Sequence, residues 1–379
     1  MIMFDKESYL KELETLVNID SGTYTVDGVN MVGDFFASRF KGIGWSVERV
    51  PISDKVGYLL DIRSRNAERF DVLLIGHMDT VFPQNEAKRR PFSIREERAY
   101  GPGVADMKCG ILAIWHALKT LPKRAKELSI RVIMNPDEEI TSLYSTDYIS
   151  KASACADHVF VMEPAMADGA FCIERKGKIK YEFEFTGIST HAGYVFDRKN
   201  ASAVYEMAQW IVALMALGNR EKGTTVNIGR IEGGSAENVV AEHAHMSMEF
   251  RMWDIAEAER VKAAVESMLR HPFIDGACVE QTFFREQKVM TPSAKTLEFV
   301  ERMKMLYKKR GIPFSVKRCG GVSDANTAAA YAPVVVDRIG PWGDHNHSEL
   351  EYMLVDSAEY AVELLQDMIL SIAESDSAG

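Results

Sequence analysis

Histidines and carboxylates that could bind metal ions follow several short apolar runs of the chain. Each pair or single residue comes directly or shortly after its run: His77 and Asp79 after 72–75, Glu138 and Glu139 after 130–134, Glu163 after 159–162, and His345 and His347 after 333–336. Ligands of open parallel sheets gather outside the carboxyl ends of the strands, so we expect these loops to face one crevice. A further acidic residue, Asp106, stands in the glycine-containing segment 101–108 just before a predicted helix. Together they predict a metal site.

The types of these side chains favour zinc. The five cysteines are scattered and never form a Cys-x-x-Cys pair, which leaves imidazole and carboxylate as ligands. Two Zn²⁺ bring four positive charges, which Asp106, Glu139 and Glu163 with one hydroxide would balance, and a neutral cluster can be buried at little desolvation cost. We therefore expect two Zn²⁺ per subunit as cofactor, with Co²⁺ or Mn²⁺ as substitutes.

The adjacent carboxylates Glu138 and Glu139 cannot both point the same way from an extended or turning backbone. We assign Glu139 to the metal and Glu138 to the general base that later returns its proton to the leaving amine. By itself, the run Asp137-Glu138-Glu139 is also typical of a solvated segment that caps the next helix. Its position beyond a buried run, with Glu163 further along, favours the chemical role.

The elements that must position these residues follow two patterns. Between about 56 and 165, buried runs alternate with helical stretches such as 111–121, which indicates a sheet covered on both faces. After Gly177 the pattern becomes two-fold in 179–185 and 244–252, and predicted helices 201–217 and 255–269 lie within and after this region. The α/β fold class follows: a parallel-containing sheet flanked by helices, with an inserted α+β domain of antiparallel sheet and two helices. We predict a discontinuous catalytic domain, 1–176 and 288–379, in which a helix over 294–311 leads back to the sheet, and an insert at 177–287.

Composition limits the classes of function. The 379 residues are 46% hydrophobic and 26% charged, which is typical of a globular protein of two domains. The net charge of −10 and the lack of a basic run beyond Lys88-Arg89-Arg90 argue against nucleic acid as a partner. The start of the chain carries charges, and no apolar stretch approaches eighteen residues. We expect no membrane partner and a cytoplasmic location.

Several motifs, taken in order, resemble those of one known family. They are His77-Met78-Asp79-Thr80-Val81-Phe82-Pro83, Gly101-x-Gly103-x-x-Asp106-Met107-Lys108, Asp137-Glu138-Glu139, Glu163-Pro164 and His347-Ser348-x-x-Glu351-Tyr352. This order resembles the dinuclear zinc carboxypeptidase and deacylase family. The family includes carboxypeptidase G (glutamate carboxypeptidase), acetylornithine deacetylase, succinyl-diaminopimelate desuccinylase and aminoacylase. The match runs over nearly the whole chain, which makes it more specific than any single motif.

The resemblance implies a role for each candidate ligand. Asp106 would bridge the two metals, His77 and Glu163 would complete one site, and Glu139 and His347 would complete the other. Asp79 would orient the His77 ring without touching the metal. The resemblance also implies a cis peptide bond between Asp106 and Met107. We prefer His347 as the ligand because of its spacing to Glu351, and His345 is the alternative.

The resemblance also implies a role for the insert as a lid and dimerisation domain. His191 would reach into the active site of a partner subunit and stabilise the oxyanion, so we expect a homodimer joined through the insert. Asn238 and Arg251 would hold a substrate carboxylate, although Arg251 could equally form a cross-strand pair with Glu249. The segment 320–324 resembles a second substrate loop, with Gly321 and Ser323 as its contact residues.

The expected reaction is hydrolysis of an amide bond beside a free carboxylate. The substrate would be a small carboxylate-bearing peptide, as for a glutamate carboxypeptidase, or an N-acyl amino acid, as for a deacylase. A tripeptidase is less favoured because related exopeptidases often carry aspartate at the position of Glu163. A non-catalytic binding protein is less favoured because Glu138 and the ligands are all present. The chain has 141–144 as Thr-Ser-Leu-Tyr where the family usually continues with Gly-Ser, so the substrate rim differs.

Overall fold

A computed structural model describes residues 4–166, 168–310 and 314–376. The chain divides into two compact units, which are described separately. Unit 1 comprises Met1–Glu174, Met290–Cys319 and Ser323–Gly379, and unit 2 comprises Arg175–Val289 and Gly320–Val322. The expectation for the start of the chain rests partly on residues 1–3, and the predicted helix 294–311 ends at residue 311; these positions lie outside the described residues.

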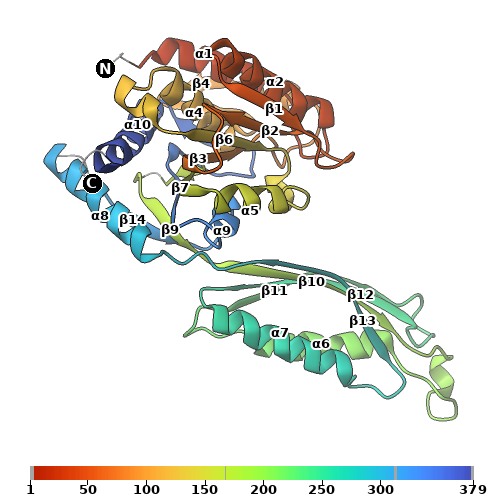
Figure 1. Ribbon diagram of the computed structural model, residues 1–379. Coiled ribbons are helices and arrows are strands. Elements are labelled where there is room, and N and C mark those ends of the chain that lie inside the picture. Colours follow the sequence, from red (N-terminus) through yellow and green to blue (C-terminus); the bar gives the residue numbers. More distant parts are fainter. Residues whose placement is uncertain (1–3, 167, 311–313, 377–379) are drawn as a thin grey trace. The chain divides into compact units, whose positions relative to one another are not determined.

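Unit 1 contains an eight-stranded mixed sheet (Figure 1). Its strands, in spatial order, are β1 (Ser46–Val50), β2 (Leu59–Arg63), β6 (Ile130–Asn135), β3 (Phe70–His77), β7 (Ala156–Val161), β15 (Val334–Asp337), β9 (Phe171–Arg175) and β14 (Val316–Cys319). The central strands β6, β3, β7 and β15 are parallel, whereas β1–β2, β2–β6 and β15–β9 pair antiparallel. The four buried runs of the sequence are these four parallel strands, which confirms the predicted parallel-containing sheet.

Helices cover both faces of this sheet. They are α1 (Lys6–Val17), α2 (Val26–Gly42), α4 (Cys109–Lys119), α5 (Thr146–Ala154), α8 (Ala294–Arg310), α9 (Asp324–Ala328) and α10 (Ser357–Asp376). The unit also contains the short helix α3 (Glu86–Arg89). Successive side chains of a strand point to opposite faces, so Val72 and Leu74 belong to one apolar cluster while Leu73 and Ile75 belong to another. The first cluster includes residues of α1, α2, α4, α8 and α10, and the second includes residues of α5 and α9. Burial on both faces explains why β3 and β6 are almost uniformly apolar.

A smaller sheet in unit 1 gathers segments that lie far apart in the sequence. Its strands, in spatial order, are β4 (Ser93–Arg95), β5 (Arg98–Tyr100), β17 (Tyr352–Leu354), β16 (Gly340–Asp344) and β8 (Pro164–Ala165). Short helical turns connect other elements of the unit: η1 (Val104–Lys108), η2 (Lys123–Glu127) and η3 (Glu138–Ile140). The small sheet matters for function because β5 precedes the segment with Asp106, β8 follows Glu163, and β16 precedes His347.

Unit 2 is an antiparallel sheet with helices on one face (Figure 1). Its strands, in spatial order, are β11 (Thr225–Gly233), β12 (His243–Met252), β10 (Gly177–Thr186) and β13 (Cys278–Gln287), and its helices are α6 (Ala203–Ala216), α7 (Ile255–Arg270) and the short turn η4 (Ala192–Tyr194). Alternate residues of β10, from Ile179 to Phe185, are buried in a cluster with Trp210 of α6 and Val261 of α7. This confirms the predicted antiparallel sheet with two helices.

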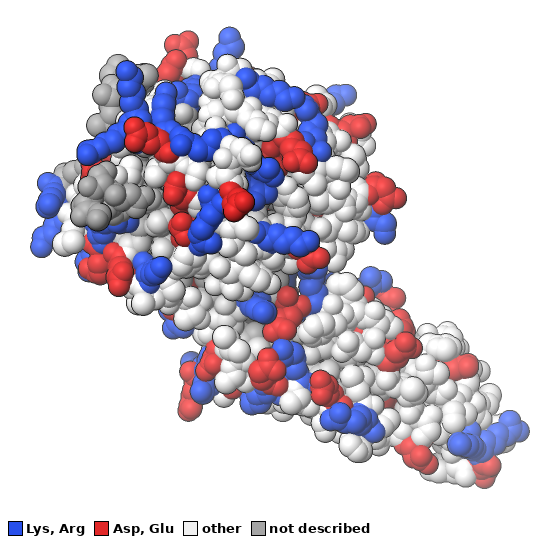
Figure 2. All heavy atoms as spheres, in the orientation of Figure 1, with Lys and Arg blue, Asp and Glu red and all other residues white. Residues whose placement is uncertain are grey.

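The surface carries both signs of charge. On the visible face of the two units, lysine and arginine side chains lie interspersed with aspartate and glutamate (Figure 2). Several of these groups pair with each other, for example Arg69 with Asp157. A surface built to bind phosphates requires a concentration of one sign of charge, which this face does not display. Among the helices described, none combines the length and the apolar character required to cross a bilayer.

Candidate metal centre

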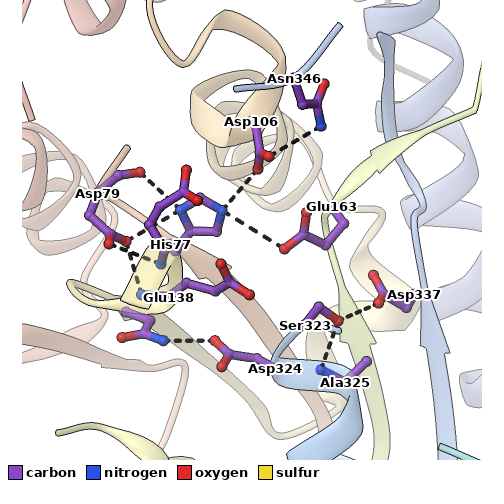
Figure 3. Close-up of polar contacts among 12 residues, drawn as sticks. His77, Asp79, Asp106, Glu138, Glu163, Ser323, Asp324, Ala325, Asp337 and Asn346 are labelled. Carbon is purple, nitrogen blue, oxygen red and sulfur yellow. Dashed lines mark hydrogen bonds and ion pairs between the residues drawn. The ribbon is translucent and has the colours of Figure 1, made fainter. Parts of the chain in front are cut away.

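The structure brings five candidate ligands together at the carboxyl ends of the parallel strands of unit 1. His77 is the last residue of β3, Glu139 lies in η3 just after β6, and Glu163 lies between β7 and β8. Asp106 comes from η1, and His347 follows β16. The close-up in Figure 3 shows Asp106 and Glu163 pointing toward the His77 ring from different segments.

The two oxygens of Asp106 face different imidazoles. His77 Nε2 lies 3.0 Å from Asp106 Oδ1 and 3.8 Å from Glu163 Oε1. His347 Nε2 lies 3.2 Å from Asp106 Oδ2 and 3.1 Å from Glu139 Oε2. Each oxygen of Asp106 therefore faces one imidazole, and each of these imidazoles also faces one further carboxylate. This is the arrangement expected of a carboxylate shared by two cations.

Glu138 lies beside this cluster. The donor atoms of His77, Glu138 and Glu163 all lie within 4.8 Å of one another, as do those of His77, Asp106 and Glu139. The neighbours Glu138 and Glu139 thus direct their carboxylates to different parts of the site, because successive residues of the turn η3 point in different directions. Glu139 meets His347, whereas Glu138 lies next to His77 and Glu163.

The electrostatics of the cluster favour the binding of cations. Burial raises the pKa of Glu139 to about 7, opposed by the hydrogen bond from His347, with Asp106 adding to the rise. Burial also raises the pKa of Glu138 well above its usual value, and the Glu163 carboxylate acts in the same direction. For Asp106, burial is outweighed by hydrogen bonds from His347 and His77, which lower the pKa. The carboxylates therefore need positive charge nearby, which the imidazoles supply here.

The donor set fits a pair of divalent cations. It offers two imidazoles and three carboxylates, and among the described residues Glu139 Oε1 is buried without a hydrogen-bond partner. A buried oxygen without a donor is costly, and a cation would satisfy it. Nitrogen and oxygen donors without a thiolate are suitable for zinc.

Asp79 supports both the histidine and the turn that carries the two glutamates. His77 Nδ1 lies 3.0 Å from the Asp79 carbonyl oxygen and 3.4 Å from carboxylate Oδ1. The carboxylate accepts hydrogen bonds from the backbone N–H groups of Glu138 at 3.1 Å and Glu139 at 3.2 Å. Thr23 donates a further hydrogen bond of 2.7 Å to Oδ2. Asp79 thus fixes His77 mainly through its backbone, while its carboxylate positions η3 (Figure 3).

The segment before Asp106 adopts a conformation that requires glycine. Gly103 has φ +72°, a left-handed value, and a Cβ atom there would lie 2.4 Å from Thr80 Cγ2. The peptide bond Asp106–Met107 is cis, as the resemblance implied. The missing side chain of Gly103 lets the segment pass close to the loop after β3.

His347 and His345 lie in different surroundings. The His347 ring contacts Asp106 and Glu139, whereas the His345 ring lies 6.0 Å from the ring of Tyr352. Asn346, between them, donates to Asp106 Oδ2 at 3.1 Å. The geometry favours His347 as the ligand.

Most of the residues predicted to contact the substrate lie in unit 2. Three of them form hydrogen bonds with backbone groups of that unit. His191 is exposed, and its Nδ1 accepts a hydrogen bond of 3.0 Å from Gly193 N–H. The carbonyl of Asn238 accepts from Ala192 N–H at 2.9 Å. Arg251 donates to Glu249 at 2.7 Å and to the Gly320 carbonyl at 3.2 Å. Arg251 therefore does pair with Glu249, but both residues lie on β12, so the pair is within one strand and not across two strands as expected. The role of Arg251 toward a substrate stays a prediction.

The two predicted contact residues of the substrate loop lie in different units and have different hydrogen-bond partners. The Gly321 carbonyl accepts a hydrogen bond of 3.0 Å from Arg175 within unit 2. Ser323, in unit 1, is buried and caps α9, where its hydroxyl donates to Asp337 at 2.6 Å and accepts from Ala325 N–H at 3.1 Å. Substrate contacts by Gly321 and Ser323 stay predictions.

Sequence reasoning missed three side chains next to the cluster. Thr23 bonds Asp79, Asn346 bonds Asp106, and the buried Asp324 accepts hydrogen bonds from Asn135 at 2.8 Å and from Ser142. Asn346 could have been suspected because it stands between two histidines. Thr23 gave no such signal, since a Ser-Gly-Thr turn is a common surface feature. Asp324 stands in the predicted substrate loop 320–324, but no role was assigned to it, since an aspartate at the start of a helix is common.

A cluster of imidazoles and carboxylates at the carboxyl ends of parallel strands, with Glu138 beside it, is the arrangement of a metal-dependent hydrolase. Comparison with known sequences agrees: residues 73–371 match the model of the peptidase family M20/M25/M40, and the chain belongs to this family. It is a metal-dependent hydrolase of the peptidase class, which confirms the resemblance inferred from the motifs.

Individual relatives cover most of the chain. Carboxypeptidase G2 from Pseudomonas sp. (strain RS-16) is 28% identical over 370 residues, which are 94% of this chain and 85% of that protein. Acetylornithine deacetylase from Erwinia tasmaniensis is 26% identical over 238 residues, 59% of this chain and 60% of that protein. The crystal structure of aminopeptidase PepT from Bacillus cereus matches with a TM-score of 0.73 at 22% identity, over 98% of this chain and 100% of that one. The last likeness establishes the fold alone.

Proposed function

We propose that the protein is a dinuclear zinc carboxypeptidase that cleaves the amide bond next to a free C-terminal carboxylate, with glutamate-like specificity. The observation that carries the proposal is the placement of Asp106 between His77 with Glu163 on one side and His347 with Glu139 on the other. The similarity to carboxypeptidase G2 over 94% of the chain supports the choice of substrate class.

The five ligands would hold the two cations, with Asp106 shared between them. Zinc ions bound there would supply Lewis-acid chemistry, polarising the scissile carbonyl and lowering the pKa of water. The remaining work belongs to the chain. Glu138 lies beside the cluster without being needed as a ligand, so it can accept a proton from the attacking water and return it to the leaving amine nitrogen.

Residues of unit 2 would bind the substrate. Arg251 and Asn238 would hold the terminal carboxylate, because a guanidinium can pair with both of its oxygens. Gly321 and, from unit 1, Ser323 would contact the substrate from the loop 320–324. His191 would donate a hydrogen bond to the oxyanion, and its exposed position is what a residue requires to reach another subunit.

We propose that the protein forms a homodimer through unit 2. On α6, Tyr205, Val212 and Met215 are exposed and apolar, with spacings that place them along one side of the helix. Strand β11 lies at an edge of its sheet. Apolar helix faces and unpaired strand edges are surfaces that associate.

The alternative reaction is removal of an acyl group from an N-acyl amino acid, which the similarity to acetylornithine deacetylase favours. A panel of N-acyl amino acids and dipeptides with different C-terminal residues, assayed with added zinc, separates the two. Preferred release of C-terminal glutamate from peptides would support the carboxypeptidase, whereas preference for simple acyl groups irrespective of the amino acid would support the deacylase. Lack of turnover of every compound would contradict both.

Replacing the proposed base tests the mechanism. We expect Glu138→Gln to lower kcat by about 10²- to 10⁴-fold, because the amide cannot accept a proton from water. Zinc content should stay at the parent value, since Glu138 is not assigned as a ligand. Parent-like turnover by this variant, measured on the best substrate of the panel, would show that another group is the base.

A further inference from the structure

A buried carboxylate outside the proposed ligand set accepts hydrogen bonds from three backbone N–H groups of the segment that carries Asp106. Glu351 Oε1 accepts hydrogen bonds from Ala105 N–H at 2.9 Å and Asp106 N–H at 3.0 Å, and Oε2 accepts from Gly103 N–H at 3.1 Å. Glu351 is 0% exposed. The segment from Gly103 to Asp106 therefore wraps around this side chain.

Glu351 connects two segments that each supply a ligand. It lies four residues after His347 and directly before β17, whose first residue, Tyr352, pairs with Tyr100 at the end of β5. The segment with Asp106 leaves the small sheet at the position where Glu351 enters it. Pairing of β17 with β5 therefore places the Glu351 carboxylate against the backbone of the segment, while His347 Nε2 lies 3.2 Å from the Asp106 side chain.

The chemistry of the contact requires a carboxylate. An ionised carboxylate only accepts hydrogen bonds and has enough lone pairs for three donors, whereas a glutamine of the same shape presents an NH₂ group on one side. That NH₂ group would face one or two N–H groups, which would be left without an acceptor in a buried place. Buried N–H groups without partners are rare, so the segment would shift to find water or another acceptor.

A shift of this segment would separate the ligands. Asp106 meets His77 at 3.0 Å and His347 at 3.2 Å, and these two histidines stand on β3 and after β16. They would not follow a movement of the segment 103–106. A displacement of less than an ångström would remove one of the two contacts, because both distances are already at the length of a hydrogen bond.

We propose that Glu351 is a positioning residue that holds Asp106 at the point shared by the two metal sites. The proposal rests on the proposed function, because it assumes that Asp106 binds both cations. Glu351 contacts neither substrate nor ligand side chains in this role. It acts through the backbone of the segment 103–106.

The test compares Glu351→Gln with a matched control. Glu206, in unit 2, is also 0% exposed and accepts two backbone N–H groups, from Phe273 at 3.0 Å and Ile274 at 2.7 Å, besides Trp210 Nε1 at 2.8 Å. Each protein is stripped of metal and titrated with Zn²⁺ in competition with a chromophoric chelator. We expect Glu351→Gln to weaken binding of at least one zinc ion about 10- to 100-fold. Glu206→Gln should lower the melting temperature but bind two zinc ions with parent affinity.

Kinetics add a second readout. With zinc in excess, kcat of Glu351→Gln should fall while KM stays close to the parent value, because the substrate contacts are unchanged. If Glu351→Gln is insoluble, Glu351→Asp is used, which retains the charge but is one methylene shorter. The same direction of change in zinc affinity is expected from it.

Each outcome distinguishes the two proposals. A parent protein that binds no zinc would overturn the proposed function. A parent that binds two zinc ions together with a Glu351 variant of equal affinity would overturn only the role of Glu351. Equal loss of zinc by the Glu351 and Glu206 variants would also overturn it, because the loss would then reflect general destabilisation.

Discussion

At the scale of single residues, the site depends on side chains that serve two partners at once. Asp79 presents its carbonyl oxygen to His77 Nδ1 and its carboxylate to the backbone of Glu138 and Glu139. A displacement of Asp79 would therefore move one ligand, the proposed base and the ring of another ligand together. This coupling explains why its surroundings matter even though Asp79 is not itself a ligand in our proposal.

Thr23 provides the most direct test of this coupling. Its hydroxyl donates a 2.7 Å hydrogen bond to Asp79 Oδ2 in a buried place. Thr23→Val has nearly the same shape but no donor, so we expect kcat to fall about 10-fold with little change in KM, because η3 becomes less well fixed. Thr23→Ser retains the donor and should restore most of kcat. Steady-state kinetics of the two variants decide the matter, and equal values of kcat for valine and serine would argue that the hydroxyl has no such role.

At the scale of elements, the strands that carry the ligands were predictable and the edge strands of unit 2 were not. Strands β3, β6, β7 and β15 are buried on both faces, so they form apolar runs that are visible in the sequence. In contrast, β11 and β13 are edge strands, and each contains a register shift against its neighbour, at Ile228/Arg230 and opposite Glu182/Phe183. An extra residue breaks the two-fold alternation on which strand prediction depends.

The candidate site shows the same division. Residue types and their order along the chain were enough to select five candidate ligands that the structure brings together. The contacts that support them could not be predicted. Thr23 and Asp324 approach the ligand loops from segments far away in the sequence, and Glu351, although part of the motif with His347, gave no sign that it would bind the backbone of the segment with Asp106. Such contacts depend on how elements pack, for which a single sequence has no local pattern. Strands of two or three residues, such as β8 and β17, are likewise too short to show a period.

A carboxylate in the first turn of α7 is expected to stabilise the folded protein in a pH-dependent way. Glu257 is buried in the first turn of this helix, and hydrogen bonds from Arg260, followed by one from Thr224, lower its pKa from 4.5 to about 2. A carboxylate with a lowered folded-state pKa stabilises the fold fully above its ordinary pKa, and this contribution disappears as the pH falls from 4.5 toward 2. Glu257→Gln should therefore lower the free energy of unfolding by about 1–2 kcal/mol near pH 7, a value discounted for the exposure of Arg260.

Denaturant titrations of both proteins at several pH values measure this difference, which should shrink below pH 4.5. The exposed Glu259 forms an ion pair with Lys262 and not with Arg260, so Glu259→Gln offers the matched control among the described residues of α7. It should change stability by less than about 0.5 kcal/mol. A difference for Glu257→Gln that is constant with pH would contradict the assigned pKa.

At the scale of the whole molecule, the proposed chemistry is distributed between two units and, in our proposal, between two subunits. Unit 1 holds the ligands and Glu138, while His191, Asn238 and Arg251 belong to unit 2. Each unit has its own apolar cluster, so unit 2 has a core with which to present these residues without help from the ligand loops. A division of this kind allows one defective subunit to complement another.

Complementation between variants tests whether His191 acts across subunits. His191→Ala alone should lower kcat about 10²- to 10³-fold through the loss of an oxyanion donor. When Glu138→Gln and His191→Ala chains are produced together, half of the dimers are mixed, and each mixed dimer contains one site with both groups intact. We expect recovery of about a quarter of the parent activity, because C₂ symmetry gives two equivalent sites per dimer.

Co-production of Glu138→Gln with a chain that carries both substitutions should give no recovery. If His191 acts within its own chain, the first mixture will stay as inactive as the second, although sedimentation shows dimers in both.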